Sequence, residues 1–135
     1  MKQKVSDYIA DRLAQERISQ VFTVTGGGAM HLNDSLGHHP GLSCLYHHHE
    51  QAAAMAAEAY ARVDNRMAAV CVTSGPGATN AITGALCAWM DSIPMLVLSG
   101  QVRYDTTVRH SGLKIRTMGV QEYDITPSVE PMTKY

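Results

Sequence analysis

Two short apolar runs, each followed by a glycine-rich turn and then by a helix-forming segment, constrain the fold of this chain more than any other feature. The β-branched run 21–25 gives way to three consecutive glycines and a short helical pattern near 29–36. The apolar run 67–73 ends at Ser74-Gly75-Pro76-Gly77, and a helix is expected from about 78 to 90. A strand that passes through a glycine turn into a helix is the repeating unit of parallel α/β sheets.

The rest of the chain extends this alternation. Apolar residues at helical spacing predict a first helix from about Ser6 to Arg17, with Ser6 as its cap. Apolar runs predict further strands at 42–47 and 95–99, and the alanine-rich segment 50–62 favours a helix. We therefore expect an α/β fold in which a parallel sheet is flanked by helices on both faces.

The segment after the last of these strands has no clear periodicity. Residues 101–117 are predicted to form a polar loop, and a loop of this length indicates a functional role. In the tail we expect a short helix and the start of another strand at 131–135, without a closing helix. The single domain expected over 1–135 would then be truncated at its C-terminal end.

The composition excludes several classes of partner. The formal net charge of -1 gives no reason to expect binding to nucleic acid or to an anionic membrane. No apolar run is long enough to cross a bilayer. The three cysteines are widely spaced and include no CxxC pair, which is typical of a reduced protein, so we expect a cytoplasmic location.

Each glycine turn has a structural and a functional interpretation. Gly26-Gly27-Gly28 opens a helix, where backbone N–H groups can meet an anion or a ring. It is neither a GxGxxG motif nor a P-loop, and a simple tight turn explains it equally well. Ser74-Gly75-Pro76-Gly77 leaves little side-chain bulk between the backbone and a neighbouring molecule, but it also suits a structural turn. The local residues leave both interpretations open.

The alanine-rich helix begins with a carboxylate. Glu50 stands where a strand gives way to this helix, so the helix dipole favours its charge. On local grounds alone it is an ordinary first-turn residue. Glu58 and Arg62 are four residues apart and are expected to form an exposed ion pair. One face of the helix should allow another element to approach closely, because alanines recur four apart at Ala53, Ala57 and Ala61.

A histidine-rich stretch invites a metal-binding interpretation. On a strand, His47 and His49 would share one face and His48 would lie on the other, so the three do not form a compact ligand set. No HExxH spacing occurs. We expect no metal ion to be held by this chain.

Several motifs, in order along the chain, resemble those of one enzyme family. They are His49-Glu50-Gln51-Ala52-Ala53, Ala57-Glu58-Ala59-Tyr60-Ala61-Arg62, Thr73-Ser74-Gly75-Pro76-Gly77-Ala78-Thr79-Asn80, Met90-Asp91-Ser92-Ile93-Pro94, Ser99-Gly100-Gln101-Val102, Gln121-Glu122-Tyr123-Asp124-Ile125 and Met132-Thr133-Lys134-Tyr135. Together they cover nearly the whole chain. The sequence resembles the N-terminal pyrimidine-binding (PYR) domain of thiamine-diphosphate-dependent enzymes of the acetolactate synthase-like family.

The resemblance implies a cofactor, thiamine diphosphate, and a catalytic role for Glu50. In such enzymes the matching glutamate hydrogen-bonds ring nitrogen N1′ and favours the imino form of the 4′-amino group, which removes the C2 proton. Gln121 matches a glutamine that faces the reacting centre in the synthases. The pyrimidine pocket is lined in the family by positions that here are Thr25, Gly26, Pro76 and Asn80.

The resemblance also implies partners outside this chain. In the family, a domain that this sequence does not contain holds Mg²⁺ and the diphosphate, and the active site lies between two subunits. A homodimer or homotetramer is therefore implied, or a separate diphosphate-binding subunit. The implied substrate is a 2-keto acid such as pyruvate. FAD is common in the synthases, with its main contacts outside the region that this chain matches.

Two departures from the family pattern leave the product open. The chain has Thr25-Gly26-Gly27-Gly28 where the family often has Tyr-Pro-Gly-Gly, and Val120 where it often has Phe. The tail resembles relatives from surface-polysaccharide gene clusters. Three interpretations follow: part of a 2-keto-acid carboligase or lyase, a split subunit of a thiamine-diphosphate 2-oxo-acid decarboxylase, or a non-catalytic dimerisation or regulatory module.

Overall fold

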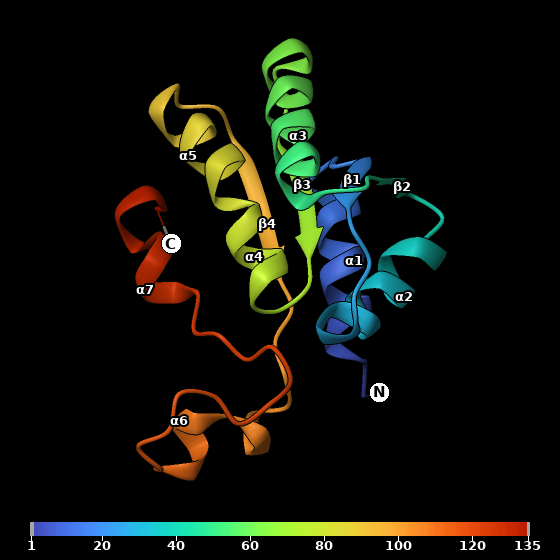
Figure 1. Ribbon diagram of the computed structural model, residues 1–135. Helices are drawn as coiled ribbons and strands as arrows, with labels where there is room; N and C mark the ends of the chain where they lie inside the picture. The colour runs from blue at the N-terminus through green and yellow to red at the C-terminus, as the bar shows by residue number, and fades with distance from the viewer. Residues whose placement is uncertain (1, 135) are drawn as a thin grey trace.

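The computed structural model describes residues 2–134, which are built around a four-stranded parallel sheet (Figure 1). Its strands are β1 (Gln20–Thr23), β2 (Ser43–Tyr46), β3 (Ala68–Val72) and β4 (Met95–Ser99), in the order β2-β1-β3-β4. The chain thus runs outward from β1 to β2 and then returns to β3 and β4 on the other side of β1. In sheets of this kind, ligands bind beyond the carboxyl ends of the strands where the order reverses, which here is between β1 and β3.

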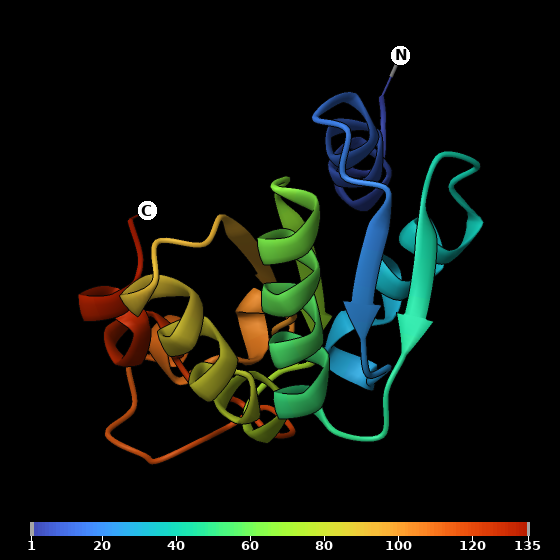
Figure 2. The same ribbon diagram turned by 90° about the horizontal axis from the view of Figure 1, so that it is seen from above.

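Helices cover both faces of the sheet (Figure 2). On one face α1 (Val5–Gln15) packs against α2 (Met30–His38), and on the other α3 (Glu50–Asp64) packs against α5 (Ile82–Met90). The shorter elements are η1 (Gly27–Ala29), α4 (Pro76–Asn80), η2 (Tyr104–Thr106), α6 (Val108–Ser111), α7 (Thr126–Val129) and η3 (Glu130–Met132). The predicted α/β fold with helices on both faces is confirmed. Among the described residues, no helix is both long and apolar enough to cross a membrane.

The central strand β3 is buried on both of its faces, as a parallel sheet requires. Successive side chains alternate between the two layers of the core. Val70 lies in the cluster that includes the α3 alanines, whereas Ala69 and Cys71 lie in the cluster formed with α1 and α2. These side chains are small or β-branched, so the helices can lie close to the sheet.

The alanine-rich helix α3 is held between the sheet and α5. Ala53, Ala57 and Ala61 are buried in the core, which confirms the predicted close-packing face. On an adjacent side of α3, Ala54 meets Gly84 of α5 so closely that a Cβ added to Gly84 would lie 2.4 Å from the Ala54 Cβ. This packing fixes the direction of α3 and therefore the position of its first residue, Glu50.

Two predicted details of the helices are wrong. Ser6 does not cap α1, because the helix begins at Val5 and Ser6 lies inside its first turn. There Ser6 is buried, and its Oγ accepts a hydrogen bond from Ser35 Oγ at 2.8 Å. The single helix expected over 78–90 is divided into α4 and α5. The chain tightens between them, where the Ala81 N–H donates to the Ala78 carbonyl three residues earlier.

The tail forms helical turns, so the strand expected at 131–135 is not found in its described part. Pro131 lies in η3, where its fixed φ and missing N–H suit the first turn of a helix better than a strand. Thr133 Oγ1 then donates to the Val129 carbonyl at 2.9 Å. Tyr135, like Met1, lies outside the described residues.

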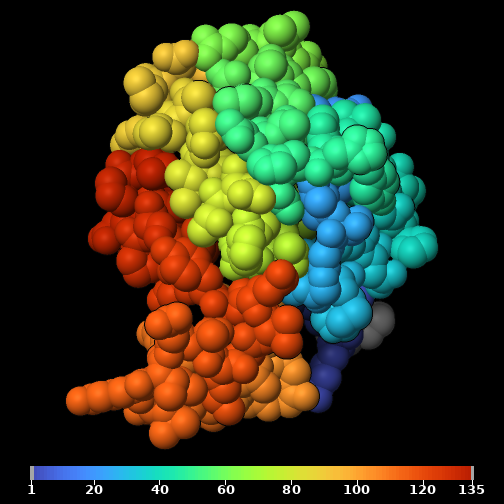
Figure 3. Space-filling model, in the orientation of Figure 1, coloured from blue at the N-terminus to red at the C-terminus, as the bar shows by residue number. Residues whose placement is uncertain are grey.

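The segment between β4 and the tail is more structured than the polar loop expected over 101–117. It contains η2 and α6. In the space-filling view this segment (orange) projects from the main body (Figure 3). It leads back to the sheet at Gln121, whose backbone contacts the turn after β3.

Candidate functional site

The turns that follow β1, β3 and β4 meet at the carboxyl edge of the sheet. The backbone N–H of Gly28, after β1, donates to Thr73 Oγ1, after β3, at 3.0 Å. Gly100, after β4, lies so close to Gly28 that an added Cβ would be 2.3 Å from the Gly28 carbonyl oxygen. These contacts place low-bulk backbone where the strand order reverses, the position at which such sheets bind ligands.

Glu50 is brought to this edge as the first residue of α3. His49 precedes the helix and caps it, since its Nδ1 accepts a hydrogen bond from the Gln51 N–H at 3.1 Å. The Glu50 side chain is half-buried, and Asn80 Nδ2 donates to its Oε2 at 3.0 Å. Oε1 accepts no hydrogen bond from any residue between 2 and 134. The site therefore holds one carboxylate oxygen and leaves the other available.

Thr73 links the two glycine turns. A Cβ at Gly26 would lie 2.5 Å from the Thr73 Cβ, and a Cβ at Gly77 would lie 2.6 Å from the Thr73 Cγ2. The same Cβ at Gly77 would lie 3.3 Å from Glu50 Oε1. The predicted residue Gly26 is therefore connected to the Glu50 region through Thr73. Thr73 was not predicted as a site residue, although a β-branched residue immediately before Ser74-Gly75-Pro76-Gly77 was a usable signal.

Some of the predicted site residues are in direct contact with one another, and others are not. Glu50 and Asn80 are joined directly by a hydrogen bond. Pro76 is exposed at the start of α4, one residue before Gly77, and so borders the same region. Thr25 is exposed after β1 and makes no hydrogen bond to the other predicted residues within 2–134. The cofactor-binding roles of these residues stay a prediction.

Gln121 approaches the site from the other side. Its backbone has a positive φ of 57°, and its carbonyl oxygen would lie 2.3 Å from a Cβ placed on Gly75, whose own φ is 58°. Glycine at 75 is therefore required both by backbone conformation and by space. Gln121 makes no hydrogen bond to Glu50 within residues 2–134, and it lines a cavity of about 670 Å³ beside Gly27 and Gly28.

Glu122, which was predicted only as part of a motif, holds Gln121 in place. Its carboxylate accepts hydrogen bonds from the backbone N–H groups of Val108 at 2.7 Å, Met118 at 2.9 Å and Gly119 at 3.2 Å. Because these bonds favour the charged form, with that from Met118 contributing most, they hold the pKa of Glu122 below its ordinary value. The Glu122 side chain thus binds both ends of the segment 108–119, and Gln121 is its immediate neighbour in the chain.

Residues 3–123 match a protein family described as the thiamine pyrophosphate enzyme, N-terminal TPP binding domain. The chain belongs to this family. The match covers the turns after β1 and β3, the start of α3 and Gln121, so it includes every residue of the candidate site.

Similar proteins of this family are acetolactate synthases. The large subunit from Lactococcus lactis subsp. lactis is 36% identical over 130 residues, which are 96% of this chain and 21% of that protein. The isozyme 3 large subunit from Escherichia coli K12 is 44% identical over 97 residues, 72% of this chain and 17% of that protein. Chloroplastic acetolactate synthase 2 of Zea mays is 35% identical over 127 residues, 94% and 18% of the two chains. The chain spans about one fifth of the length of these curated relatives.

The residues of this TPP-binding domain fit part of the cofactor that the family name specifies. A flat ring needs a low-bulk surface and a group that can hydrogen-bond its edge. The packing of Gly26 and Gly77 against Thr73 provides the surface, and Glu50 Oε1 provides the hydrogen-bonding group. Over residues 2–134, no three His, Cys, Asp or Glu side chains gather into a group that could hold a metal ion. The fit shown by these residues concerns the ring of the cofactor.

Proposed function

We propose that this chain is the pyrimidine-binding and cofactor-activating part of a thiamine-diphosphate-dependent carboligase or lyase resembling acetolactate synthase, with Glu50 as its acid. The hydrogen bond from Asn80 Nδ2 to Glu50 Oε2 at 3.0 Å supports this most strongly. It joins the first residue of α3, the helix after β2, to the last residue of α4, the short helix after β3, beside the point where the strand order reverses. A carboxylate that served only the helix dipole would need no such partner.

The chain's own residues have distinct tasks in this proposal. Asn80 holds Glu50 Oε2 and so orients the carboxyl group, leaving Oε1 to hydrogen-bond ring nitrogen N1′. Protonated Glu50 donates to that nitrogen and takes the proton back in the reverse direction. Thr25, Gly26 and Pro76 line the pocket in which the ring is oriented, beside the low-bulk surface that Gly26 and Gly77 form against Thr73. When bound, thiamine diphosphate supplies the carbon nucleophile that attacks the keto carbon of the substrate.

The remaining parts are proposed to lie outside this chain. Mg²⁺ and the diphosphate would be held by another domain or by a separate subunit. The protein would act as a homodimer or homotetramer, or as a partner of that separate subunit. The substrate would be a 2-keto acid such as pyruvate, with Gln121 facing it, and FAD, if used, would be bound mainly elsewhere. The resemblance of the tail supports a role in surface-polysaccharide synthesis.

The role of Glu50 is tested by exchange of the cofactor's C2 proton with deuterium in the complete enzyme that contains this chain. Glu50→Gln should slow this exchange by roughly 100-fold or more, because the carboxyl proton is lost from N1′. Glu58→Gln is the matched control, since Glu58 lies on the same helix but pairs with Arg62. An unchanged exchange rate in Glu50→Gln would contradict the proposal and favour the non-catalytic module.

A second experiment distinguishes the assembled enzyme from a split subunit. The chain is mixed with candidate diphosphate-binding chains, and binding of thiamine diphosphate is measured by calorimetry. Binding that appears only in the mixture supports a separate subunit. Binding by one continuous polypeptide supports a domain of a complete enzyme.

A further inference from the structure

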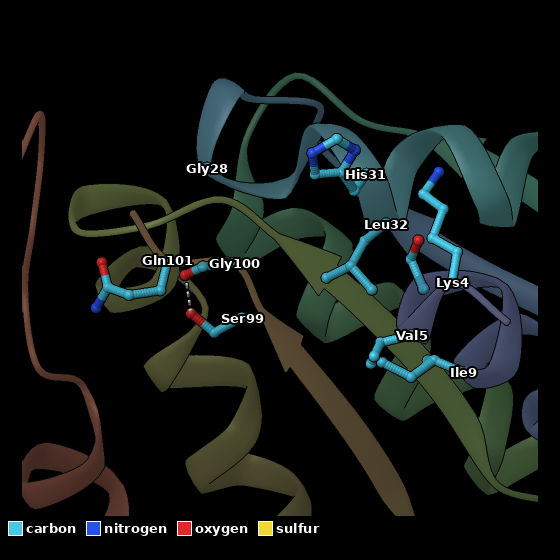
Figure 4. Close-up of a pocket in the computed structure, with 10 residues that line it drawn as sticks. Lys4, Val5, Ile9, Gly28, His31, Leu32, Ser99, Gly100 and Gln101 are labelled. Carbon is cyan, nitrogen blue, oxygen red and sulfur yellow. Dashed lines mark hydrogen bonds between the residues drawn. The ribbon is translucent and has the colours of Figure 1, made fainter. Parts of the chain in front are cut away.

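Two cavities lie on either side of the first glycine turn, and one histidine lines both. The first has a volume of about 570 Å³ and lies between α1, α2 and the end of β4. The second, of about 670 Å³, extends from the same turn to the segment that carries Gln121. His31, in the first turn of α2, lines both of them, as does Gly28. Figure 4 shows its imidazole beside the Gly28 turn, with Leu32 of the same helix below it in the view.

The imidazole of His31 differs from those of the other histidines in and just after α2. His38 Nδ1 is bonded to the Asp34 carbonyl oxygen at 2.9 Å, and His39 Nε2 lies 3.2 Å from Asp11 Oδ1. His31 is exposed to the cavities and has no hydrogen-bond partner within residues 2–134. Both of its ring nitrogens are therefore available to a bound molecule.

Two further polar side chains of the second cavity lack partners. Gln121 is exposed on the cavity wall and its amide makes no hydrogen bond to a described residue. Ser74 is only 3% exposed, lines the cavity, and its hydroxyl has no hydrogen-bond partner in the described part of the chain. Among the described residues, Ser74 Oγ is not one of the fully enclosed atoms that lack a partner, so this hydroxyl is open to the cavity and available to a bound molecule.

The rest of the cavity wall limits what that molecule can be. Val102, Met118 and Val120 form an apolar side. Arg103 borders the cavity, but its side chain is largely exposed to solvent and is paired with Asp105. Unpaired polar side chains that face an apolar wall suit a small molecule with several hydroxyl or carbonyl oxygens.

We propose that the second cavity binds a hydroxylated acceptor aldehyde or ketone, and that His31 determines this specificity together with Gln121 and Ser74. The inference rests on the proposed function and names the substrate class for it. The imidazole and the Gln121 amide hydrogen-bond the acceptor's hydroxyl groups, and the Ser74 hydroxyl hydrogen-bonds an oxygen at the buried end. An acceptor of the same length without hydroxyl groups leaves all three unpaired, which is how polar sites reject apolar analogues.

The test compares D-glyceraldehyde with propanal as acceptors in the complete holoenzyme with pyruvate as donor. The wild-type enzyme should prefer D-glyceraldehyde in kcat/KM. His31→Leu should reduce this preference by about tenfold, mainly through the KM for D-glyceraldehyde, since one hydrogen-bonding side chain is lost. His31→Gln should restore part of the preference. His38→Leu, on the same helix but outside both cavities, should leave it unchanged.

Two further measurements separate this inference from the proposed function. Exchange of the cofactor's C2 proton should be the same in His31→Leu and in the wild type, so a failure of the Glu50 role is recognised independently. In cofactor-free protein, D-glyceraldehyde should shift the His31 ring resonances in NMR spectra more than propanal does. Equal shifts with the two aldehydes, or an unchanged preference in His31→Leu with normal C2 exchange, would overturn the proposal.

Discussion

The two sides of the candidate site are held in place by different forces. Glu50 stands on a helix whose alanines are buried against the sheet, with Ala54 pressed against Gly84 of α5. Gln121 stands on a projecting segment that is tied down by the three hydrogen bonds to Glu122. Core packing therefore positions the proposed acid, and local hydrogen bonding positions the proposed substrate-facing residue.

This difference predicts that a substitution which loosens the Gln121 segment leaves the position of Glu50 unchanged. Segments held by few buried apolar contacts open at a lower free energy than the core does. A rigid Glu50 suits a task that requires one fixed hydrogen bond to a ring nitrogen. A more easily opened Gln121 side suits the entry and release of substrates.

The largest expected effect comes from disturbing the packing beneath Glu50. In Gly84→Ala the new Cβ would lie 2.4 Å from the Ala54 Cβ and 2.8 Å from the Ala54 carbonyl carbon, so α3 and α5 must move apart. We expect the free energy of unfolding to fall by about 1–3 kcal/mol, as for other overpacked cores. Urea unfolding followed by circular dichroism measures it.

A matched control is available in α2. Gly37→Ala places a Cβ in ordinary contact, 3.6 Å from the Tyr46 hydroxyl. Because alanine favours a helix more than glycine does, this variant should gain about 0.5–1 kcal/mol. Equal free energies of unfolding for the Gly84→Ala and Gly37→Ala variants would show that the close contact between α3 and α5 does not determine the stability of the core.

The reactivity of the cysteines provides a second measure of how tightly the core around β3 is packed. Burial, with a smaller contribution from Cys44, raises the pKa of Cys71 to about 12, whereas Cys87 is exposed. At about pH 8, a thiol reagent should modify Cys87 within the native protein and Cys71 only after unfolding. Gly84→Ala should accelerate the modification of Cys71. Modification of Cys71 as fast as that of Cys87 in the wild type would contradict the burial of β3.

The same contrast explains what could be predicted from the sequence. The strands, α3 and the buried alanine face follow from residue periodicity, because burial imposes a regular pattern on the chain. Periodicity does not reveal the hydrogen bonds of Ser6, Thr73 and Glu122, since each depends on a partner distant in sequence or on the exact path of a loop. The expected tail strand is wrong because Pro131 suits the first turn of a helix as well as an extended segment, and local residues do not distinguish the two.

The Gln121 side should be loosened by Glu122→Ala without loss of the core. This substitution removes the acceptor for three backbone N–H groups, so the amides of Val108, Met118 and Gly119 should exchange with solvent faster. The midpoint of thermal unfolding should change little. Hydrogen exchange followed by NMR measures the first effect and calorimetry the second.

Glu130→Ala is the control for this substitution. Glu130 is exposed in η3, and no residue in the described range donates a hydrogen bond to its side chain. Its replacement should leave the exchange of the three amides unchanged. If Glu122→Ala also leaves them unchanged, the segment is positioned by its apolar contacts instead, and Gly75 becomes the main constraint on Gln121.

Acid should produce the smallest of these effects, confined to the same segment. The backbone N–H groups of Met118, Val108 and Gly119 hold the pKa of Glu122 below its ordinary value in the folded protein. For a carboxyl group whose folded pKa is lowered, the stabilisation is fully present above the unfolded pKa and is lost as the pH falls through the folded pKa. The three hydrogen bonds should therefore survive at the ordinary glutamate pKa of about 4.3 and weaken only in stronger acid.

The Met118 and Gly119 amide resonances, followed during an acid titration, should shift below that pH in the wild type and not in Glu122→Gln. If these amide resonances finish shifting above about pH 4.3, the three N–H donors do not stabilise the charged form of Glu122.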